Sequence, residues 1–585
     1  MPDPSNTLAQ KHISSRSSRR GKLETAEKRS WIPWLWIVAA AALAHLWCLG
    51  SQFYMDDMTG IRDSESIRAG EFWTSRTLMW TRFCYVLEYK LFGMSPVGFH
   101  AVNWLLHTAV ACTLFGFGRD FLRGRAPAGV ALFGALLFVV HPLASEIPNY
   151  ARTQDLAWVT LFSLLASWAL LRFLLDGGYW KLLWVMLGIV GATLSKGPGL
   201  FHALMMVGAV GLAFATSAHW CLLRRKGAWL AAFFLIGAGI LWAAGALPNW
   251  EQATHRWGES RFIGHGYTLT RVFWEFSWRT VVPVSLCSDH HIAETLIPPG
   301  AKFWNIPDTG AIWAALGMLV LTVVSLILAW RKTTRLFGVC LFLFVATILF
   351  RVTYLIPEFM PEYRIYPGLP WICLGAAIAL GAGWRKLFGE VSPRPPVVVL
   401  LLLFAVMSAK RSFVWHDLDR LTADVLKQYP AQARAIWELH DRDIHNGDWQ
   451  RVINRQHTAW PKVFKNFLAE NKRLAPGREL PSGHFALADV ACKARYAIAL
   501  THARGDAAGL MEIRKLEAYM KALRLGPETH RIHWTYFYKA KGRVLEDTGN
   551  YQAALDLMRR EDMPYFKDSD IERLEKKLAG KKAGG

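Results

Sequence analysis

The sequence predicts an all-α membrane protein, in which a polytopic helical bundle is followed by a soluble helical domain. Two observations lead to this fold class. Of the 585 residues 53% are hydrophobic, and they gather in runs such as 31–49, 228–247 and 311–330, close to the ~20 residues needed to cross a bilayer. The basic residues behind the formal net charge of +22 lie mostly in short loops between such runs. A nucleic-acid partner is therefore not expected, because it would need one basic face.

Residues 1–30 form a basic tail in front of the first apolar run. The tail holds Arg16, Arg19, Arg20, Lys22, Lys28 and Arg29. The positive-inside rule places such a tail in the cytoplasm. Because no small-residue cleavage site follows the run 31–49, we expect a retained helix there and not a signal peptide.

About eleven spans follow from the apolar runs, and they define a membrane domain over 31–409. They are expected at 31–50, 97–118, 126–142, 156–174, 179–195, 199–220, 228–247, 311–330, 335–356, 367–384 and 396–409. Counted from a cytoplasmic N-terminus, every basic loop cluster falls on the cytoplasmic side. The long loops 51–96 and 248–310 and, because eleven is odd, the tail 410–585 then lie outside. Short loops between spans and the lack of a retention signal favour a bacterial inner membrane.

Two adjacent carboxylates, Asp56 and Asp57, stand just beyond the first span. Carboxylates at a membrane surface repel each other and lose hydration, which can raise the pKa of one of them toward the range of a general base. The alternative is a solvated pair that caps a helix, since Asp is common at helix starts. The rest of this loop mixes aromatic and basic residues, as an interfacial helix over 80–91 would.

His100, Asn103 and His107 share one face of the second span, at positions i, i+3 and i+7. Polar residues within a span normally face protein or a watery cavity. They therefore either support a polar site or form interhelical hydrogen bonds. A metal site is not expected here, because no carboxylate or cysteine lies at a recognisable ligand spacing.

The second outer loop is rich in polar residues, with His141, Glu146, Arg152 and Asp155. These side chains could line an active cavity, or they could cap a turn between two spans. Lys196 ends the fifth span, where it could hold a lipid phosphate or extend to the interface. An ATPase loop is not predicted, because the Gly-Lys-Ser/Thr sequence is absent.

A third polar segment, 357–367, separates the ninth and tenth spans and contains Arg364. A guanidinium donates two parallel hydrogen bonds to phosphate oxygens, so Arg364 is a candidate phosphate ligand. A salt bridge to Glu362 or Glu358 is the alternative.

Residues 410–585 predict a soluble helical domain. Apolar residues recur there at helical spacing, for example at Ile436, Ile513 and Leu516. The segment 544–557 resembles the helix-turn-helix junction of a tetratricopeptide repeat. A solenoid of such repeats presents a concave surface to peptides, whereas the alternative is a packing appendage with degenerate repeats.

Six short polar segments follow one another in a characteristic order along the chain. They are Tyr54-Met55-Asp56-Asp57; Ser95 to His100 with Asn103 and His107; His141-Pro142 with Glu146 and Arg152 to Leu156; Ser195-Lys196; Val282 to Asp289; and Pro361 to Pro367. No segment is specific alone, but together they resemble the polytopic protein O-mannosyltransferases that carry tetratricopeptide repeats, the TMTC family, and their bacterial relatives. The chain departs from that family at Gly197, where glutamate is frequent, and at Ala151-Arg152, where a Gly-Arg pair is frequent.

The resemblance implies a GT-C type glycosyltransferase, which passes a sugar from a polyprenyl-phosphate donor to an extracytoplasmic acceptor with inversion. It makes Asp56 or Asp57 the catalytic base, with Arg152, Lys196 and Arg364 as contacts of the donor phosphate. Glu146 and Asp155 would orient these groups, and supporting roles would fall to His100, Asn103, His107, His141, Glu362 and Tyr366. This chemistry requires no metal cofactor, although Asp289-His290-His291 could bind a divalent ion.

Other functions stay open at this point. The acceptor could be a protein hydroxyl, which the repeats favour, or a glycolipid such as a lipopolysaccharide core. Two readings from other classes are a transporter of lipid-linked sugars and a non-catalytic membrane scaffold. The long first outer loop suits an enzyme better than a transporter, for which broken helices in paired halves would be expected.

Overall fold

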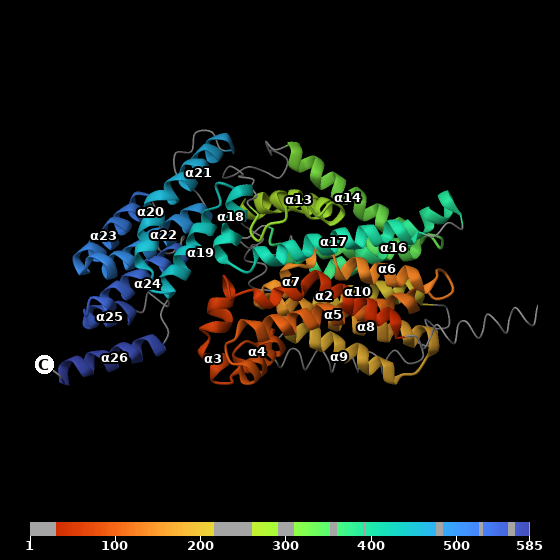
Figure 1. Cartoon of the computed structure of the whole chain (residues 1–585), viewed down its shortest axis with the longest axis horizontal. Helices are drawn as coiled ribbons and strands as arrows, with labels where there is room; N and C mark the ends of the chain where they lie inside the picture. Colours follow the sequence, from red (N-terminus) through yellow and green to blue (C-terminus); the bar gives the residue numbers. More distant parts are fainter. Residues whose placement is uncertain are drawn as a thin grey trace, which may run out of the picture.

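The computed structural model describes residues 31–215, 260–290, 309–350, 360–389, 393–474, 484–523, 525, 531–559 and 568–583. Regular structure within these residues is helical throughout, apart from one isolated β-bridge between His290 and Met360. The all-α prediction is thereby confirmed for the described part of the chain. Figure 1 shows two bodies, a bundle of long apolar helices and a domain of shorter helices from the C-terminal third.

The bundle helices follow the predicted spans. They are α2 (Ile32–His45), α5 (Pro96–Phe121), α6 (Ala128–Val139), α7 (Glu146–Asn149), α8 (Gln154–Asp176), α9 (Trp180–Ser195), α10 (Gly199–Phe214), α14 (Thr309–Trp330), α15 (Arg335–Phe350), α16 (Leu369–Phe388) and α17 (Arg394–Val414). Among the described residues, 6 helices are long and apolar enough to cross a membrane, or 7 if the bent pair over 128–149 is one span. The apolar helices α9, α10 and α15 have only 16 residues each. The expected span 228–247 lies outside the described residues, so the count of eleven stays a prediction.

Small residues allow the bundle helices to pack closely. A Cβ added to Gly134 of α6 would lie 3.1 Å from the Leu374 backbone of α16, and one added to Gly116 of α5 would lie 2.4 Å from Trp168 of α8. Glycine at such points lets helix backbones approach each other closely. In lipid, burial of apolar surface does not drive helix association, so close van der Waals packing has to stabilise it. Large buried side chains, including Phe117 and Trp371, fill the remaining space.

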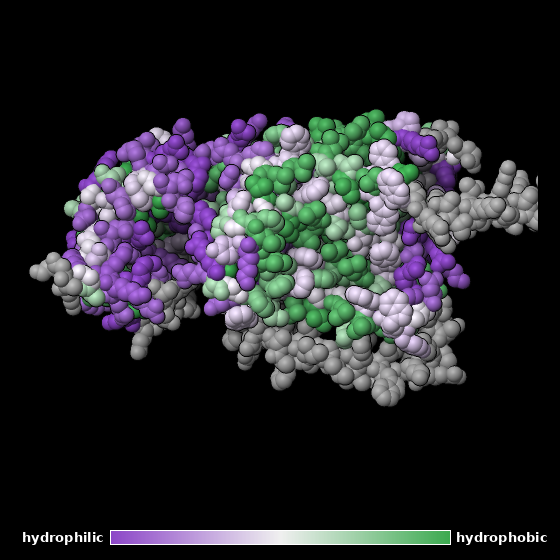
Figure 2. Space-filling model, turned by 60° about the horizontal axis from the view of Figure 1, so that its bottom comes forward, coloured by the Kyte–Doolittle hydropathy of each residue, from purple (hydrophilic) through white to green (hydrophobic). Residues whose placement is uncertain are grey.

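Apolar side chains cover the outside of the bundle in a broad region, whereas the C-terminal domain is largely hydrophilic (Figure 2). Valines and leucines of α14 and α17, such as Val320 and Val399, are exposed on the bundle. Such a surface is stable against lipid and costly in water.

Basic residues at several of the described bundle helix ends contact neighbouring helices. Arg123 forms an ion pair with Asp176 at 3.1 Å, and Arg172 one with Asp120 at 3.3 Å. Arg335 Nη1 donates to the Ala213 carbonyl at 3.3 Å. The loop after α5 therefore lies beside the end of α8, and the start of α15 lies beside the end of α10.

The first outer loop folds at the end of the bundle beside the C-terminal domain (Figure 1). It contains a single π-helical turn, η2 (Met58–Arg62), the short α3 (Glu65–Arg68), the 3-10 turns η3 (Phe72–Thr74) and η4 (Arg76–Leu78), and α4 (Met79–Phe92). Helix α4 coincides with the helix expected over 80–91. The loop expected over 248–310 contains one described helix, α13 (Ser260–Val281), and the segment after Met360 forms the 3-10 helix η8 (Glu362–Gly368).

The C-terminal domain consists of short helices. They are α18 (Leu418–Gln428), α19 (Ala433–His445), α20 (Trp449–Thr458), α21 (Trp460–Leu474), α22 (His484–Arg504), α23 (Asp506–Ala522), α24 (Arg531–Asp547), α25 (Tyr551–Met558) and α26 (Asp568–Ala583). The predicted apolar positions Ile436, Ile513 and Leu516 are buried in it. Helices α24 and α25 meet at Gly549, whose φ of +70° suits glycine. A turn thus lies within the predicted 544–557 junction, but the tetratricopeptide assignment stays a prediction.

Contacts join the two bodies tightly near the first span. Tyr54, Tyr150, Trp415 and Leu418 share one apolar cluster. Arg411 of α17 donates to Asp424 of α18 at 2.7 Å. The C-terminal domain is therefore packed against the first and second outer loops.

We expect the C-terminal domain to lie outside the cytoplasm. Alkaline phosphatase fused after Gly585 should be active, and a reporter that works only in the cytoplasm should be silent there, because the basic loops lie at the opposite end of the bundle. The same reporters inserted after Thr333, between α14 and α15, are the control and should give the reverse result. A bright cytoplasmic reporter at the C-terminus would contradict this topology.

Candidate functional site

Asp57 links the first outer loop to the second. Its carboxylate is buried, and its Oδ1 accepts a hydrogen bond from the Arg152 backbone N–H at 2.6 Å, while Oδ2 accepts one from the Tyr54 N–H at 3.3 Å. Burial raises the pKa of Asp57 to about 8, although these backbone donors oppose the rise. Both carboxylate oxygens are thus occupied by backbone groups.

Asp56, in contrast, is exposed. Its backbone N–H donates to the Tyr150 hydroxyl at 3.2 Å. Its neighbourhood is a void of only about 10 Å³, lined by Met55, Asp56, Glu146, Tyr150, Ser288, Asp289, Pro361, Tyr363, Trp415 and Arg434. The void brings together residues from both outer loops, the segment before α16 and helix α19.

Glu146 and Glu362 form a buried acidic pair behind this void. Glu146 Oε2 accepts from the Tyr363 backbone N–H at 2.7 Å. Glu362 Oε1 accepts from the Cys287 N–H at 2.6 Å and lies 2.7 Å from His290 Nε2. Arg411 interacts electrostatically with both carboxylates. The acidic pair therefore ties 282–290 and η8 to the second outer loop.

The three candidate phosphate ligands are connected through two other residues. Lys196 Nζ lies 2.7 Å from Asp155 Oδ2, and Asp155 also interacts with Arg152. The Tyr363 ring centroid lies 6.0 Å from Lys196 Nζ and 5.6 Å from the Arg364 guanidinium carbon. The three cations therefore share neighbours in the fold, and the positive charge of Lys196 is partly balanced by Asp155.

The polar residues predicted as supporting groups contact mainly backbone. His100 Nδ1 lies 3.0 Å from the Pro148 carbonyl, and Asn103 Nδ2 donates to the Ile147 carbonyl at 2.8 Å. His107, His141 and Tyr366 are also buried. The His107 ring nitrogens lie 2.8 Å from the Tyr366 hydroxyl and 3.1 Å from the Val139 carbonyl, and His141 Nε2 lies 3.0 Å from the Thr280 carbonyl. These contacts hold the bent segment 139–151, and none of these side chains lines the void beside Asp56.

Glu88 of α4 supports the start of α8. Its Oε1 accepts a hydrogen bond from Gln154 Nε2 at 2.7 Å, and Oε2 is buried without a partner among the described residues. Burial raises the pKa of Glu88 to about 8, and the bond from Gln154 only partly opposes this. Glu88 is therefore held mainly in its neutral form next to the segment that carries Arg152.

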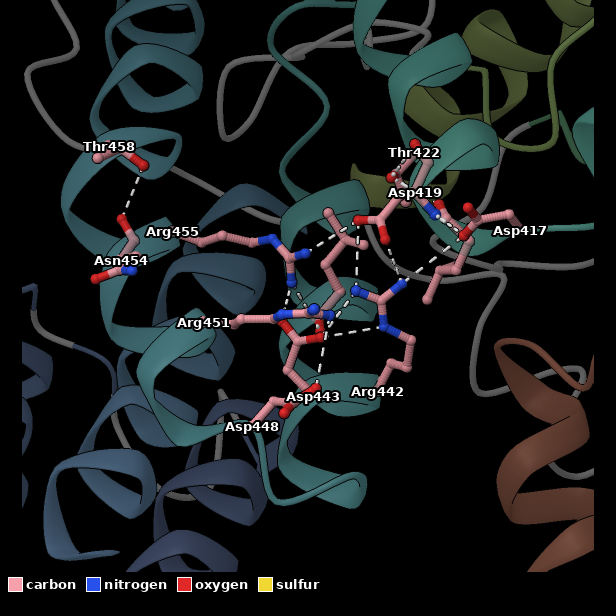
Figure 3. Close-up of polar contacts among 12 residues, drawn as sticks. Asp417, Asp419, Thr422, Arg442, Asp443, Asp448, Arg451, Asn454, Arg455 and Thr458 are labelled. Carbon is pink, nitrogen blue, oxygen red and sulfur yellow. Dashed lines mark hydrogen bonds and ion pairs between the residues drawn. The ribbon is translucent and has the colours of Figure 1, made fainter. Parts of the chain in front are cut away.

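An ion network orients helix α19, which carries Arg434 to the void. Figure 3 shows Asp419 of α18 between Arg442 of α19, at 2.7 Å, and Arg455 of α20, at 3.0 Å. Arg442 also pairs with the buried Asp443 at 2.8 Å. Arg62 of the first outer loop donates to His445 Nδ1 at 3.0 Å. These contacts connect three helices of the C-terminal domain with the loop that carries Asp56.

Three arginines of this region were not among the site residues predicted from the sequence: Arg82, Arg411 and Arg434. Arg82 lines a second, larger cavity together with Arg152. Arg434 donates to Glu438 Oε1 at 3.2 Å and lines the void with Asp56. Only the mixture of basic and aromatic residues in 80–91 signalled Arg82. For Arg411 and Arg434 the sequence carries no signal, because long-range packing brings them to the site.

Metal-binding residue types do not gather in the described residues: no group of three or more His, Cys, Asp or Glu residues there could hold an ion. His290 contacts Glu362 and the Tyr429 hydroxyl, the latter at 2.9 Å. His291, the third residue of the predicted alternative metal loop, lies outside the described residues.

Comparison with known proteins supports the family resemblance. No protein-family model matches the chain. The chain is 23% identical to protein O-mannosyl-transferase F38B6.6 of Caenorhabditis elegans, over 69% of this chain and 59% of that protein. It is 25% identical to human protein O-mannosyl-transferase TMTC1, over 72% of this chain and 54% of that protein. Human protein O-mannosyl-transferase TMTC4 is 23% identical over 68% of this chain and 62% of that protein.

These relatives carry the family name that the six sequence segments indicated, so the resemblance is confirmed. The chain spans somewhat more than half the length of each of these relatives.

A Glu88→Gln variant tests the buried neutral carboxyl. The folded-state pKa of about 8 lies above the unfolded value near 4.5, so unfolding releases a proton between these pH values. Wild-type stability should therefore fall as pH rises from 5 to 8, relative to the Gln variant, by a few degrees in apparent Tm in detergent. The exposed Glu65→Gln change is the control and should give a constant offset. A constant offset for Glu88→Gln as well would contradict this assignment.

Proposed function

We propose that this chain is a membrane glycosyltransferase that moves a hexose, mannose by analogy with the names of its relatives, from a polyprenyl phosphate to a protein Ser or Thr hydroxyl. The observation that carries the proposal is the position of Asp56: an exposed carboxylate directly beyond the first span, beside connected cations. The relatives named protein O-mannosyl-transferases support the reaction class. Polyprenyl phosphate as the donor and inversion at the sugar are parts of this proposal.

The proposed chemistry needs one base and stabilisation of one leaving group. Asp56 takes the proton of the acceptor hydroxyl while that oxygen attacks the anomeric carbon from the face opposite the phosphate. The bond between the anomeric carbon and the phosphate oxygen breaks, and its electron pair leaves with the polyprenyl phosphate. The new glycosidic bond has the inverted configuration. Because the sugar phosphate is already activated, a carboxylate and cations suffice and the step requires no metal.

Asp56 fits the role of base better than Asp57 does. The sequence alone left the choice between the two carboxylates open. The two oxygens of Asp57 already accept backbone hydrogen bonds from Arg152 and Tyr54. Asp56 is exposed and lines the void. We therefore assign Asp57 as a positioning residue, which holds the Asp56 backbone against the second outer loop.

Cations near the donor stabilise the charge that develops on the departing phosphate. Arg152, Lys196 and Arg364 are the proposed contributors, because they surround Asp155 and Tyr363. A guanidinium suits a phosphate better than an ammonium does, since it donates two parallel hydrogen bonds.

The acceptor side is proposed to lie between Asp56 and helix α19. Arg434 and Glu438 of α19 line a second small void together with Met55 and Asp289. Burial raises the pKa of Glu438 to about 7, Arg434 opposes this rise, and the charge of Asp56 contributes to it. The voids have room for about one water molecule. A polypeptide acceptor must therefore displace α19 or Tyr363 as it binds.

The proposed location is a bacterial inner membrane, with the N-terminus in the cytoplasm and the C-terminal domain outside. The arrangement of basic loops at the end of the bundle remote from Asp56 supports this orientation.

Asp56→Asn should lower kcat by about 10²-fold or more, the usual contribution of a general base, with little change in donor binding. Transfer of mannose from a short polyprenyl phosphate mannose to a Ser/Thr peptide measures it, and NMR of the product reports the anomeric configuration. Asp57→Asn should have a milder effect, since it preserves one of the two backbone contacts. The matched control is Asp63→Asn in the same loop, expected to stay within about twofold. Near-normal turnover in Asp56→Asn would remove Asp56 as the base.

Arg434→Gln should raise the KM for the acceptor peptide by about fivefold or more while kcat at saturation changes little, because Arg434 borders the proposed acceptor path but not the reacting bond. Donor affinity should be unchanged. Arg451→Gln on α20 removes one positive charge from the same domain and serves as the control, since Arg451 is largely exposed. An equal effect of the two variants would indicate a general charge effect and not an acceptor contact.

A further inference from the structure

A polar cavity of about 580 Å³ lies between the first outer loop and Arg152, whose backbone N–H donates to Asp57. Arginines, carboxylates and hydroxyl groups surround it: Thr59, Ser64, Glu65, Ser66, Glu71, Thr74, Arg82 and Arg152, with Gly60 and Ala69. Unlike the two voids of about 10 Å³ beside Asp56, it has room for a sugar phosphate.

Two guanidinium groups face this cavity without a carboxylate bonded between them. Arg82 donates one hydrogen bond to Ser66 Oγ, and its buried Nε has no partner among the described residues. Burial and then the charge of Arg152 lower the pKa of Arg82, and Glu71 opposes them without reversing the direction. A bound anion would relieve the repulsion between the two arginines and satisfy the buried donor.

The loop approaches Arg152 closely at Gly60. A Cβ added to Gly60 would lie 3.2 Å from Arg152 Nε. The absence of a side chain here leaves the guanidinium beside the cavity instead of pushing it away. The other cation of the region, Lys196, already forms an ion pair with Asp155. Arg82 and Arg152 line this cavity, whereas Lys196 does not.

An aromatic rim adjoins the cavity next to Glu71 and Thr74. Phe72 packs edge-on against Trp73 and Phe83, at centroid distances of 5.1 and 5.5 Å. Trp80 continues the rim to α8, where it contacts Trp158 and Phe162 at 5.5 Å each. Trp73 is 59% exposed and Phe83 40% exposed. A long apolar chain can lie along such a surface, whereas a water-soluble phosphate gains nothing from it.

We propose that this cavity binds the head of a polyisoprenyl phosphate, with Arg82 and Arg152 holding the phosphate and the aromatic rim holding the first isoprene units. The hydroxyl groups of Ser64, Ser66 and Thr74 then face the sugar. This inference rests on the proposed function and adds to it a phosphate-binding residue, Arg82, and a path for the lipid. It places the donor beside Arg82 and Arg152, and the acceptor beside Asp56 and helix α19.

The test measures equilibrium binding of citronellyl phosphate, a short isoprenoid phosphate, to the full chain in lipid nanodiscs by calorimetry. Arg82→Gln should weaken binding about tenfold or more, as expected for one charge-assisted contact. Lys90→Gln, at an exposed position of the same helix, is the matched control and should bind like the wild type. Trp73→Ala should weaken binding of citronellyl phosphate and leave binding of inorganic phosphate unchanged.

A second variant covers the case in which Arg82→Gln does not fold. Ser66→Ala removes the hydroxyl that holds Arg82 and should weaken binding about threefold, with a wild-type elution profile in size-exclusion chromatography. Wild-type affinity in a folded Arg82→Gln or Ser66→Ala variant overturns the assignment. Equal affinity of the wild type for inorganic and citronellyl phosphate also overturns it, because the site would then bind free phosphate.

The binding test and the transfer test fail in different ways. If the wild type transfers mannose but Arg82→Gln binds citronellyl phosphate normally, this inference falls and the proposed function stands. If citronellyl phosphate binding depends on Arg82 but no mannose is transferred, the lipid phosphate site stands and the proposed glycosyltransferase function falls.

Discussion

The hydrogen bond from the Arg152 backbone to the buried Asp57 carboxylate is the constraint on which the rest of the site depends. It joins the first outer loop, which follows α2, to the second, which precedes α8. A buried carboxylate is costly unless it is protonated or hydrogen-bonded, and Asp57 meets this requirement with backbone donors from both loops. This hydrogen bond therefore fixes the backbone next to Asp56 relative to the backbone of Arg152.

Polar residues within the spans maintain this connection. His100, Asn103 and His107 bind backbone carbonyls of the bent segment between α6 and α8. A bent backbone near a membrane leaves carbonyls that its own helix does not satisfy, and side-chain donors from α5 supply the missing hydrogen bonds. The acidic pair Glu146 and Glu362 adds η8 to the same assembly. Rigid polar packing of this kind suits the proposed transfer site, which would have to orient two substrates.

The C-terminal domain contributes to this arrangement. Its helix α19 lies against Asp56, and the network of Asp419, Arg442 and Arg455 fixes α19 relative to α18 and α20. Because Arg442 and Arg455 share Asp419 and the buried Asp443, the network holds more firmly than single exposed ion pairs would. The position of α19 beside Asp56 therefore depends on the packing of this domain.

Apolar runs and helical periodicity were enough for the sequence to determine an all-α chain with several apolar helices long enough to span a membrane and a helical C-terminal domain, because these features depend on residue spacing along one chain. The order of the six segments also indicated the family and gathered Asp56, Arg152, Lys196 and Arg364 as candidates. Only the tertiary structure decided which carboxylate of the Asp56-Asp57 pair is exposed, and that Arg82 and Arg434 border the two spaces beside it. Burial and partners of a side chain depend on packing between segments far apart in the sequence, which local pattern does not encode.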